Sequence, residues 1–275
     1  MDKMQDIDNI IESKIILFKN EELNKKIELF SIFYKSDNLI VQGYVLQKKN
    51  LSKKVPIIIF CRGGNRTYGE VKPNLQVQRD EFIYLAENEK AIIFFPNYRG
   101  SSMSEGEDEL CGKDVNDIIS LYNIFEKYKY CDIDKIALYG WSRGGMMAIK
   151  VATMVPWVKT IILSGSPYSM MRLAIDRPKM GTLYKEQFNL TESDIIERAP
   201  KYLMERIPKN ISILILHGSN DMDVNVSHAY SIGWKCQKYN LLYKLIIFPN
   251  GDHMLMDYKV DVMREIVTWI DKYLL

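Results

Sequence analysis

A serine, a histidine and an aspartate, each in its own motif, could together carry out nucleophilic catalysis. Residues 140–145 read Gly-Trp-Ser-Arg-Gly-Gly and lie between an apolar run and a helical pattern. A sharp strand-to-helix turn of this kind exposes the serine hydroxyl at the top of a sheet, and the flanking glycines allow the strained bend. Ser142 is therefore the candidate nucleophile, and the rest of the chain has to supply a base and an acid.

The search for a base is short, because the chain has three histidines. His253 lies in the turn-rich segment 249–253, which follows the apolar run 243–248. A loop after the last strand is where a sheet with such a serine turn carries its general base, so we assign this role to His253. We interpret His217 as a structural histidine that hydrogen-bonds its own turn, and we expect His228 on the face of a helix.

Two carboxylates in the segment 217–224 compete for the role of the acid. Asp221 could accept the Nδ1–H of His253 and so direct Nε2 toward Ser142. Asp223 is the alternative, two residues later. One of them could instead start the next helix, since an aspartate there satisfies free backbone N–H groups. Local chemistry does not choose between them.

Three motifs in this order resemble those of the prolyl oligopeptidase family, within the α/β-hydrolase superfamily. They are Gly-x-Ser-x-Gly-Gly at 140–145, His-Gly-Ser-Asn-Asp-Met-Asp-Val at 217–224, and Asp252-His253. The segments 96–101 (Pro-Asn-Tyr-Arg-Gly-Ser) and 112–117 also match, so the resemblance covers roughly residues 30–275. It implies a serine hydrolase with its catalytic acid at Asp221, the aspartate three residues before Val224.

The chain departs from the family in two places. Large members carry an N-terminal β-propeller that filters substrates by size, and 275 residues leave no room for one. Many members have a tyrosine that donates to the oxyanion after the first core strand, where this chain has Arg62. We therefore expect the oxyanion donors to be backbone N–H groups, one from Arg143 and one from the turn at Arg62 and Gly63.

Composition limits the other function classes. The net charge of +2 and a pI near 8.1 are too balanced to suggest a nucleic-acid or membrane partner. The four cysteines form no Cys-x-x-Cys pair, and we interpret them as reduced thiols in a cytoplasmic protein. We expect no cofactor and no metal. The N-terminus lacks the pattern of a secretory signal, and no apolar run reaches the roughly 18 residues of a transmembrane helix.

The alternation of apolar strand runs with helical patterns predicts a mostly parallel sheet flanked by helices on both faces, and the family resemblance implies that this sheet is an α/β-hydrolase fold. Residues 1–28 are expected to form an arm or short helix, and 29–275 a single catalytic domain that begins with a hairpin turned at 36–38. The expected buried strands are 55–61, 91–95, 135–139, 160–163, 211–216 and 243–248. The expected helices are 76–89, 114–130, 144–155, 226–239 and 257–273.

One segment, 166–209, interrupts the alternation of strands and helices and is rich in Met and Tyr. It could be a lid over the carboxyl ends of the strands, where open sheets of this class bind ligands, or two amphipathic helices beside the sheet. We name Trp141, Tyr168 and Met171 as candidate substrate-binding residues. We expect structural roles for the Arg143 side chain, for Arg99 and for Asp117.

The sequence thus predicts a peptidase-type serine hydrolase that acts on short peptides or acyl-amino acids. The alternatives are a carboxylesterase with the same three residues and a non-catalytic interaction protein. Substrate choice lies in the pocket walls, so fold and motifs do not separate the first two. The chain could also form a homodimer, as single-domain relatives often do.

Overall fold

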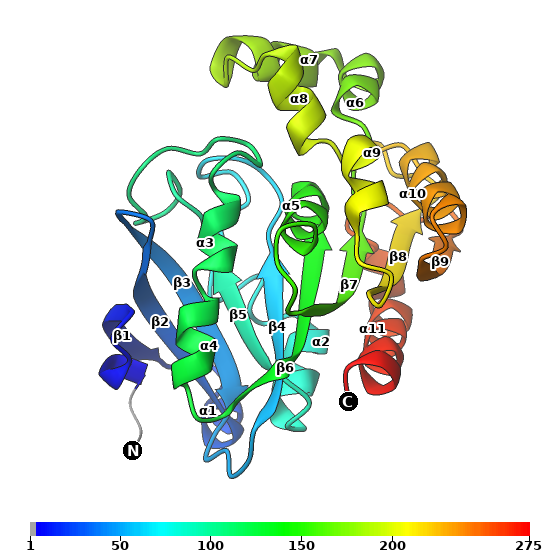
Figure 1. Cartoon of the computed structure of the whole chain (residues 1–275). Helices are drawn as coiled ribbons and strands as arrows, with labels where there is room; N and C mark the ends of the chain where they lie inside the picture. Colours follow the sequence, from blue (N-terminus) through cyan, green and yellow to red (C-terminus); the bar gives the residue numbers. More distant parts are fainter. Residues whose placement is uncertain (1–3) are drawn as a thin grey trace.

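A nine-stranded mixed sheet forms the centre of the molecule in the computed structural model, which describes residues 4–275 (Figure 1). The strand order is β1-β2-β3-β5-β4-β6-β7-β8-β9. The strands are β1 (Ile10–Ile16), β2 (Ile27–Ser36), β3 (Leu39–Lys48), β4 (Val55–Cys61), β5 (Ile92–Pro96), β6 (Cys131–Trp141), β7 (Val158–Ser164), β8 (Ser212–Gly218) and β9 (Leu242–Phe248).

The expected α/β-hydrolase sheet is confirmed. Strands β4 to β9 pair in parallel, whereas β1, β2, β3 and β5 pair antiparallel in that order. Every residue of β4 and β8 is buried, as their continuous apolar runs predicted. The hairpin of β2 and β3 also forms as expected, and Asp37 turns it with a positive φ of 51°.

The N-terminal segment differs from the expected arm. Ile10–Ile16 is a strand at the edge of the sheet, paired antiparallel with β2, and only α1 (Glu21–Lys26) is helical in the expected sense. The spacing of Ile10, Ile11 and Ile15 looked helical because an edge strand buries few of its side chains. Residues 1–3 of the expected arm lie outside the described residues.

Helices cover both faces of the sheet (Figure 1). One face carries α3 (Val115–Ile119), α4 (Tyr122–Lys127), α5 (Arg143–Ala152) and α10 (Ser227–Lys238), and the other carries α2 (Asp80–Glu87) and α11 (Lys259–Tyr273). The single helix expected at 114–130 is divided into α3 and α4. The division falls where the Leu121 N–H bonds the carbonyl of Ile118, a tighter turn than the α-helical one.

The insertion 166–209 forms a chain of short helices rather than two amphipathic ones. They are α6 (Met170–Asp176), α7 (Pro178–Thr182), a π-helical turn (Leu183–Gln187), α8 (Glu192–Arg198), α9 (Pro200–Leu203) and a 3₁₀ turn (Met204–Arg206). In Figure 1, α6, α7 and α8 project beyond the carboxyl ends of the central strands. This is the edge of the sheet at which Ser142 follows β6.

A buried ionic network joins the hairpin to α3. Arg99 Nη2 lies 2.8 Å from Asp117 Oδ1 and 2.7 Å from Asp37 Oδ2. Asp117 also accepts hydrogen bonds from the hydroxyl of Ser36 and the backbone N–H of Arg99. The expected structural roles of Arg99 and Asp117 are confirmed, because the contacts of both side chains hold the hairpin and α3 together.

Replacing Arg99 by Met should strongly destabilise the fold. The substitution leaves the buried Asp117 carboxylate without its cation, and breaking a buried pair in this way costs about 3–5 kcal/mol. Urea denaturation measures the loss. Arg264→Met is the control, since its pair with Asp261 is exposed and should change stability by under about 1 kcal/mol. Equal losses in the two variants would contradict the assignment.

Candidate active site

Ser142 occupies a strained turn between β6 and α5. Its backbone has φ 55° and ψ −127°, a combination that ordinary residues rarely adopt. Two backbone bonds hold the turn: the Ser142 N–H donates to the carbonyl of Ser164, and the Gly145 N–H donates to that of Ser142. A Cβ at Gly144 would lie 1.7 Å from the carbonyl oxygen of Cys61, so α5 packs on β4 only if this residue is glycine.

Asp221 and His253 meet in a direct hydrogen bond. His253 Nδ1 lies 2.7 Å from Asp221 Oδ2, and a carboxylate only accepts, so Nδ1 carries the proton. The other oxygen, Oδ1, accepts from the backbone N–H groups of Asp223 and Val224. The imidazole packs against Gly165, where a Cβ would lie 2.9 Å from its Cε1 atom and where φ is +57°.

Asp221 is held in its ionised form. Burial alone would raise the pKa of this carboxyl, but hydrogen bonds from His217 and His253 outweigh that effect and lower the pKa well below its usual range. His217 Nε2 lies 3.2 Å from Asp221 Oδ2 and 2.7 Å from the carbonyl oxygen of Val224. His217 therefore braces the turn that carries Asp221, as expected.

Asp223 neither accepts a hydrogen bond from His253 nor starts the next helix, the two roles considered for it. It does not start α10, whose N-cap is Val226. Its carboxylate lies 2.8 Å from Arg177 Nη1, and its carbonyl accepts from the same group. Asp223 therefore ties the loop after β8 to the insertion.

A cavity of about 300 Å³ lies over Ser142 and His253, which both line it. The described structure has no hydrogen bond between these two side chains; such bonds often tighten only with substrate. We name this cavity the acyl pocket. The insertion supplies a largely apolar wall to it, made of Pro167, Met170, Leu173, Arg177, Met180 and Tyr184.

The candidate substrate-binding residues are only partly brought to this pocket. Trp141 lines it, and its ring centroid lies 5.4 Å from that of His253. Tyr168 and Met171 do not line it; their neighbours Pro167 and Met170 do. Ser169 caps α6 and so fixes which side of the helix faces Ser142. The three-residue spacing of Pro167, Met170 and Leu173 was the signal that sequence reasoning missed.

The side chain of Arg143 is held in a buried ionic cluster. It lies 2.7 Å from Asp108 and also pairs with Asp114, while the two carboxylates raise its pKa well above the usual value despite burial. The expected structural role is confirmed. Its backbone N–H lies in the first turn of α5, where helical N–H groups lack partners inside the helix. The oxyanion role of this group stays a prediction.

Arg62 supports the neighbouring loop from inside. Its guanidinium donates to the carbonyls of Asn97, Gly63 and Arg66, and burial lowers its pKa to about 10. The turn it supports passes directly over the nucleophile, because a Cβ at Gly63 would lie 3.0 Å from the Cβ of Ser142. A backbone donor from this turn remains our prediction, and the arginine side chain is occupied elsewhere.

His228 lies fully buried in α10 rather than on an open helix face. Its Nδ1 accepts the backbone N–H of Tyr168 at 2.9 Å, which fixes the start of the insertion. Burial lowers the pKa of His228 to about 4, so the ring is neutral at physiological pH. A histidine that belongs to none of the three motifs therefore anchors the wall of the acyl pocket.

Residues 4–275 contain no cluster of three or more His, Cys, Asp or Glu side chains that could hold a metal ion. The four cysteines are all buried and free. Within the same residues, every helix is too short or too polar to cross a bilayer.

Comparison with known proteins identifies the family. The model of the prolyl oligopeptidase family matches residues 78–275, which is most of the chain. The chain belongs to the prolyl oligopeptidase family. This membership makes it a hydrolase of the serine peptidase type, and it confirms the resemblance seen in the motifs.

Individual relatives are distant. The "Uncharacterized peptidase YtmA" of Bacillus subtilis is 24% identical over 220 residues, covering 78% of this chain and 82% of the relative. The "Probable dipeptidyl-aminopeptidase B" of Aspergillus terreus is 23% identical and covers 89% of this chain. The acylaminoacyl peptidase of Pyrococcus horikoshii superposes with a TM-score of 0.77 at 18% identity over 94% of this chain, a likeness of fold. The chain spans only 28% of the Aspergillus protein and 44% of the Pyrococcus one.

The burial of neutral His228 makes stability depend on pH. Its pKa is about 4 in the folded chain and near 6.5 when unfolded. The unfolded chain therefore binds the proton more readily between these values. The free energy of unfolding should be fully retained above pH 6.5 and fall by on the order of 3 kcal/mol as the pH drops to 4. His228→Asn, which keeps an acceptor for Tyr168, should flatten this slope in urea denaturation. An unchanged slope would refute the assignment.

Proposed function

We propose that this chain is a serine hydrolase that cleaves short peptides or acyl-amino acid bonds through Ser142, His253 and Asp221. The observation that carries the proposal is the 2.7 Å hydrogen bond from His253 to an ionised Asp221, beside a cavity shared with a strained serine. The relatives named as peptidases support the same class of reaction.

In the first half of the reaction, Ser142 Oγ attacks the carbonyl carbon of the scissile bond while His253 Nε2 takes the hydroxyl proton. Asp221 stabilises the imidazolium through Nδ1–H and keeps the ring oriented. The tetrahedral intermediate collapses when the carbon–nitrogen bond breaks, and His253 gives its proton to the leaving amine. The acyl group stays on Ser142.

In the second half, a water molecule replaces the amine. His253 removes a proton from the water as the water oxygen attacks the acyl carbon, the bond between that carbon and Ser142 Oγ then breaks to release the carboxylic acid, and His253 returns the proton to Ser142 Oγ. The backbone N–H groups of Arg143 and of the turn at Gly63 would donate to the negative oxygen in both halves. Each such donor typically lowers the barrier by roughly 2.7–4 kcal/mol.

The acyl pocket favours a small, apolar acyl group. Its walls are mainly thioethers, aliphatic side chains and the rings of Tyr68, Trp141 and Tyr184, and its volume is about 300 Å³. That is the lower end of the roughly 300–1,000 Å³ typical of small-molecule sites. Methionine adapts to different shapes, so we expect several apolar acyl groups to be accepted.

Ser142→Ala should abolish turnover, by on the order of 10⁴-fold or more, since nothing else in the site can form the acyl-enzyme. The wild-type chain should react with a fluorophosphonate probe at this residue, and the variant should not. Peptide p-nitroanilides and p-nitrophenyl esters, assayed in parallel, test the substrate class. Ester cleavage without amide cleavage would replace the peptidase proposal by the carboxylesterase one, and an unlabelled Ser142 would point to a non-catalytic protein.

The two aspartates should differ sharply. Asp221→Asn removes the acceptor that fixes the histidine tautomer and should lower kcat by about 10³–10⁴-fold. Asp223→Asn weakens the half-exposed pair with Arg177, and both residues line the acyl pocket, but it leaves the bond between Asp221 and His253 intact, so kcat should stay within a few-fold of wild type. Both variants should be assayed on one p-nitrophenyl ester after their folding is verified by circular dichroism. A larger loss in the Asp223 variant would reverse the assignment of the acid.

A further inference from the structure

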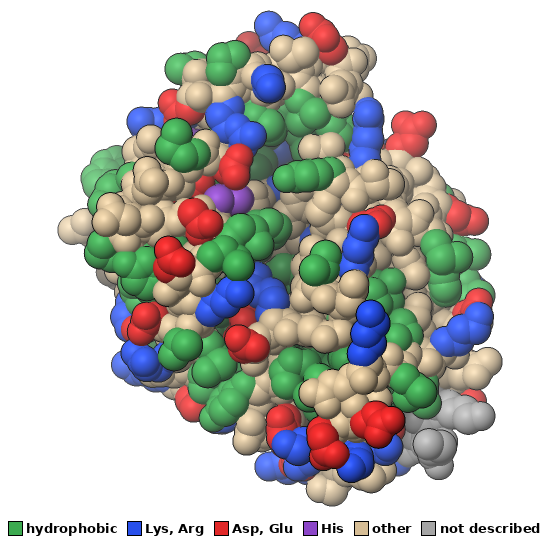
Figure 2. Space-filling view, turned by 180° about the vertical axis from the view of Figure 1, so that it is seen from behind, with side chains coloured by type: hydrophobic (Ala, Val, Ile, Leu, Met, Phe, Trp, Pro, Cys, Tyr) green, Lys and Arg blue, Asp and Glu red, His purple; other side chains and the backbone are tan. Residues whose placement is uncertain are grey.

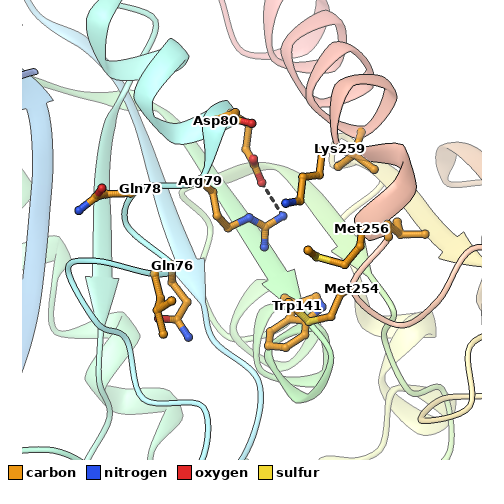
Figure 3. Close-up of a pocket in the computed structure, with 12 residues that line it drawn as sticks. Gln76, Gln78, Arg79, Asp80, Trp141, Met254, Met256 and Lys259 are labelled. Atoms are coloured by element: carbon orange, nitrogen blue, oxygen red, sulfur yellow. Dashed lines mark ion pairs between the residues drawn. The ribbon is translucent and has the colours of Figure 1, made fainter. Parts of the chain in front are cut away.

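A second groove lies on the far side of Trp141 from the insertion. It holds about 360 Å³ and runs between α2 and the N-terminal end of α11. Its lining residues include Leu75, Gln76, Gln78, Trp141, Met254 and Met256. Figure 3 shows Trp141, Met254 and Met256 together on one side of it, with Gln76 and Gln78 across from them.

This groove is continuous with the site already described. Trp141 and Gln76 line both it and the acyl pocket. Met254 follows His253 directly in the chain, and the indole N–H of Trp141 donates to the carbonyl of His253 at 3.4 Å. The groove therefore begins at the loop that carries the general base, whereas the acyl pocket lies over Ser142 under the insertion.

The proposed reaction determines which part of a substrate can occupy this groove. The acyl part of a substrate becomes bonded to Ser142 and stays in the acyl pocket. The leaving amine must lie beside the imidazole of His253, because it receives its proton from that ring. A groove that starts at the His253 loop and extends away from the acyl pocket is the space open to the residue carrying this amine.

Exposed apolar side chains define the chemistry of the groove. Leu75, Met254 and Met256 are 58%, 50% and 48% exposed, large values for such residues, and all three line it. Figure 2, which views the molecule from behind, shows hydrophobic side chains around a hollow on this side. Apolar surface gathered beside a reactive site is typical of a binding site.

The charges around the groove largely cancel. Arg79 pairs with Glu81 at 2.5 Å and donates to the hydroxyl of Tyr139, so its cation is already satisfied (dashed line in Figure 3). Asp80 and Lys259 are both exposed, with opposite signs. With no net charge in the lining, apolar contact is what distinguishes one ligand from another.

We propose that this groove is the leaving-group subsite, and that it selects substrates with a large apolar residue, aromatic or aliphatic, directly after the scissile bond. The proposal rests on the function proposed above. It assigns Met254, Met256 and Leu75 as specificity-determining contacts, with Trp141 as the wall that separates the two halves of the substrate.

The test compares N-acetyl-Ala-Phe-amide with N-acetyl-Ala-Gly-amide, which share the acyl group and differ only in the leaving residue. Wild-type kcat/KM should favour Phe by at least about tenfold, as hydrophobic pockets typically discriminate. Met256→Asp, which puts a charge into the groove at an exposed position, should reduce this preference to about twofold. Met154→Asp is the matched control, since Met154 is similarly exposed (49%) and lies outside both pockets.

Whether Met256→Asp slows acylation or deacylation distinguishes a leaving-group subsite from a general loss of activity. The leaving group is gone before deacylation, so the loss in Met256→Asp should appear in acylation, measured as the pre-steady-state burst, and not in hydrolysis of the acetyl-alanyl enzyme. A slower deacylation would mean that the groove holds the acyl group and would overturn the proposal. A wild-type chain with no preference for Phe would also overturn it while leaving the proposed hydrolase intact.

A binding measurement keeps the inference testable if no amide is turned over. Calorimetry with the Ser142→Ala chain should show tighter binding of the Phe peptide than of the Gly peptide, and Met256→Asp in this background should remove the difference. Equal binding of the two peptides would rule out the subsite. Failure of the wild-type chain to label or to hydrolyse any ester would instead count against the proposed function.

Discussion

The site depends on a backbone constraint: Ser142 holds φ 55° and ψ −127° where an unstrained residue would continue the strand or begin the helix. Such a conformation costs on the order of 1–3 kcal/mol and persists only when its surroundings enforce it. Here they do so by close packing, because Gly144 lies against the carbonyl of Cys61 and Gly145 against Ser166. A side chain at either glycine would push α5 off the sheet and relax the turn.

Buried cations then hold the loops around this turn. Arg143, the residue after the nucleophile, pairs with Asp108 and Asp114. Arg62 binds the carbonyls of the loop that passes over Ser142. A buried guanidinium without partners would be very costly, so each arginine fixes its loop rather than offering a charge to substrate. The reactive surface is consequently left to backbone N–H groups, the imidazole and apolar walls.

Much of the fold, and the hydrogen bond between Asp221 and His253, could be predicted from the sequence, and the same physical reasons explain which predictions were wrong. Strands buried on both faces, such as β4, must be apolar throughout, and Ser142, Asp221 and His253 stand in motifs tied to particular turns. β1 was missed because an edge strand buries few of its side chains and so shows neither a continuous apolar run nor a regular alternation of apolar and polar residues. Met171 was named instead of Met170 because the phase of α6 depends on where Ser169 caps it, and the three-residue spacing of Pro167, Met170 and Leu173 that marks the pocket face was overlooked. The spacing of neighbouring residues could not reveal that His228 anchors the insertion, because His228 and its partner Tyr168 are 60 residues apart in the chain.

The two pockets on either side of Trp141 have walls of different construction. The acyl pocket is walled by the insertion, which is tied to the domain by Arg177 and Asp223, by His228 and by Arg66, whose guanidinium bonds the carbonyl of Gln187. The groove beyond Trp141 is walled instead by α2 and α11, which pack on the sheet directly. In the proposed mode of binding, one half of the substrate contacts a wall held by a few polar ties, and the other half contacts helices packed on the core. Substitutions in the insertion should therefore alter the acyl preference without disturbing the leaving-group side, because no described residue of the insertion lines the groove.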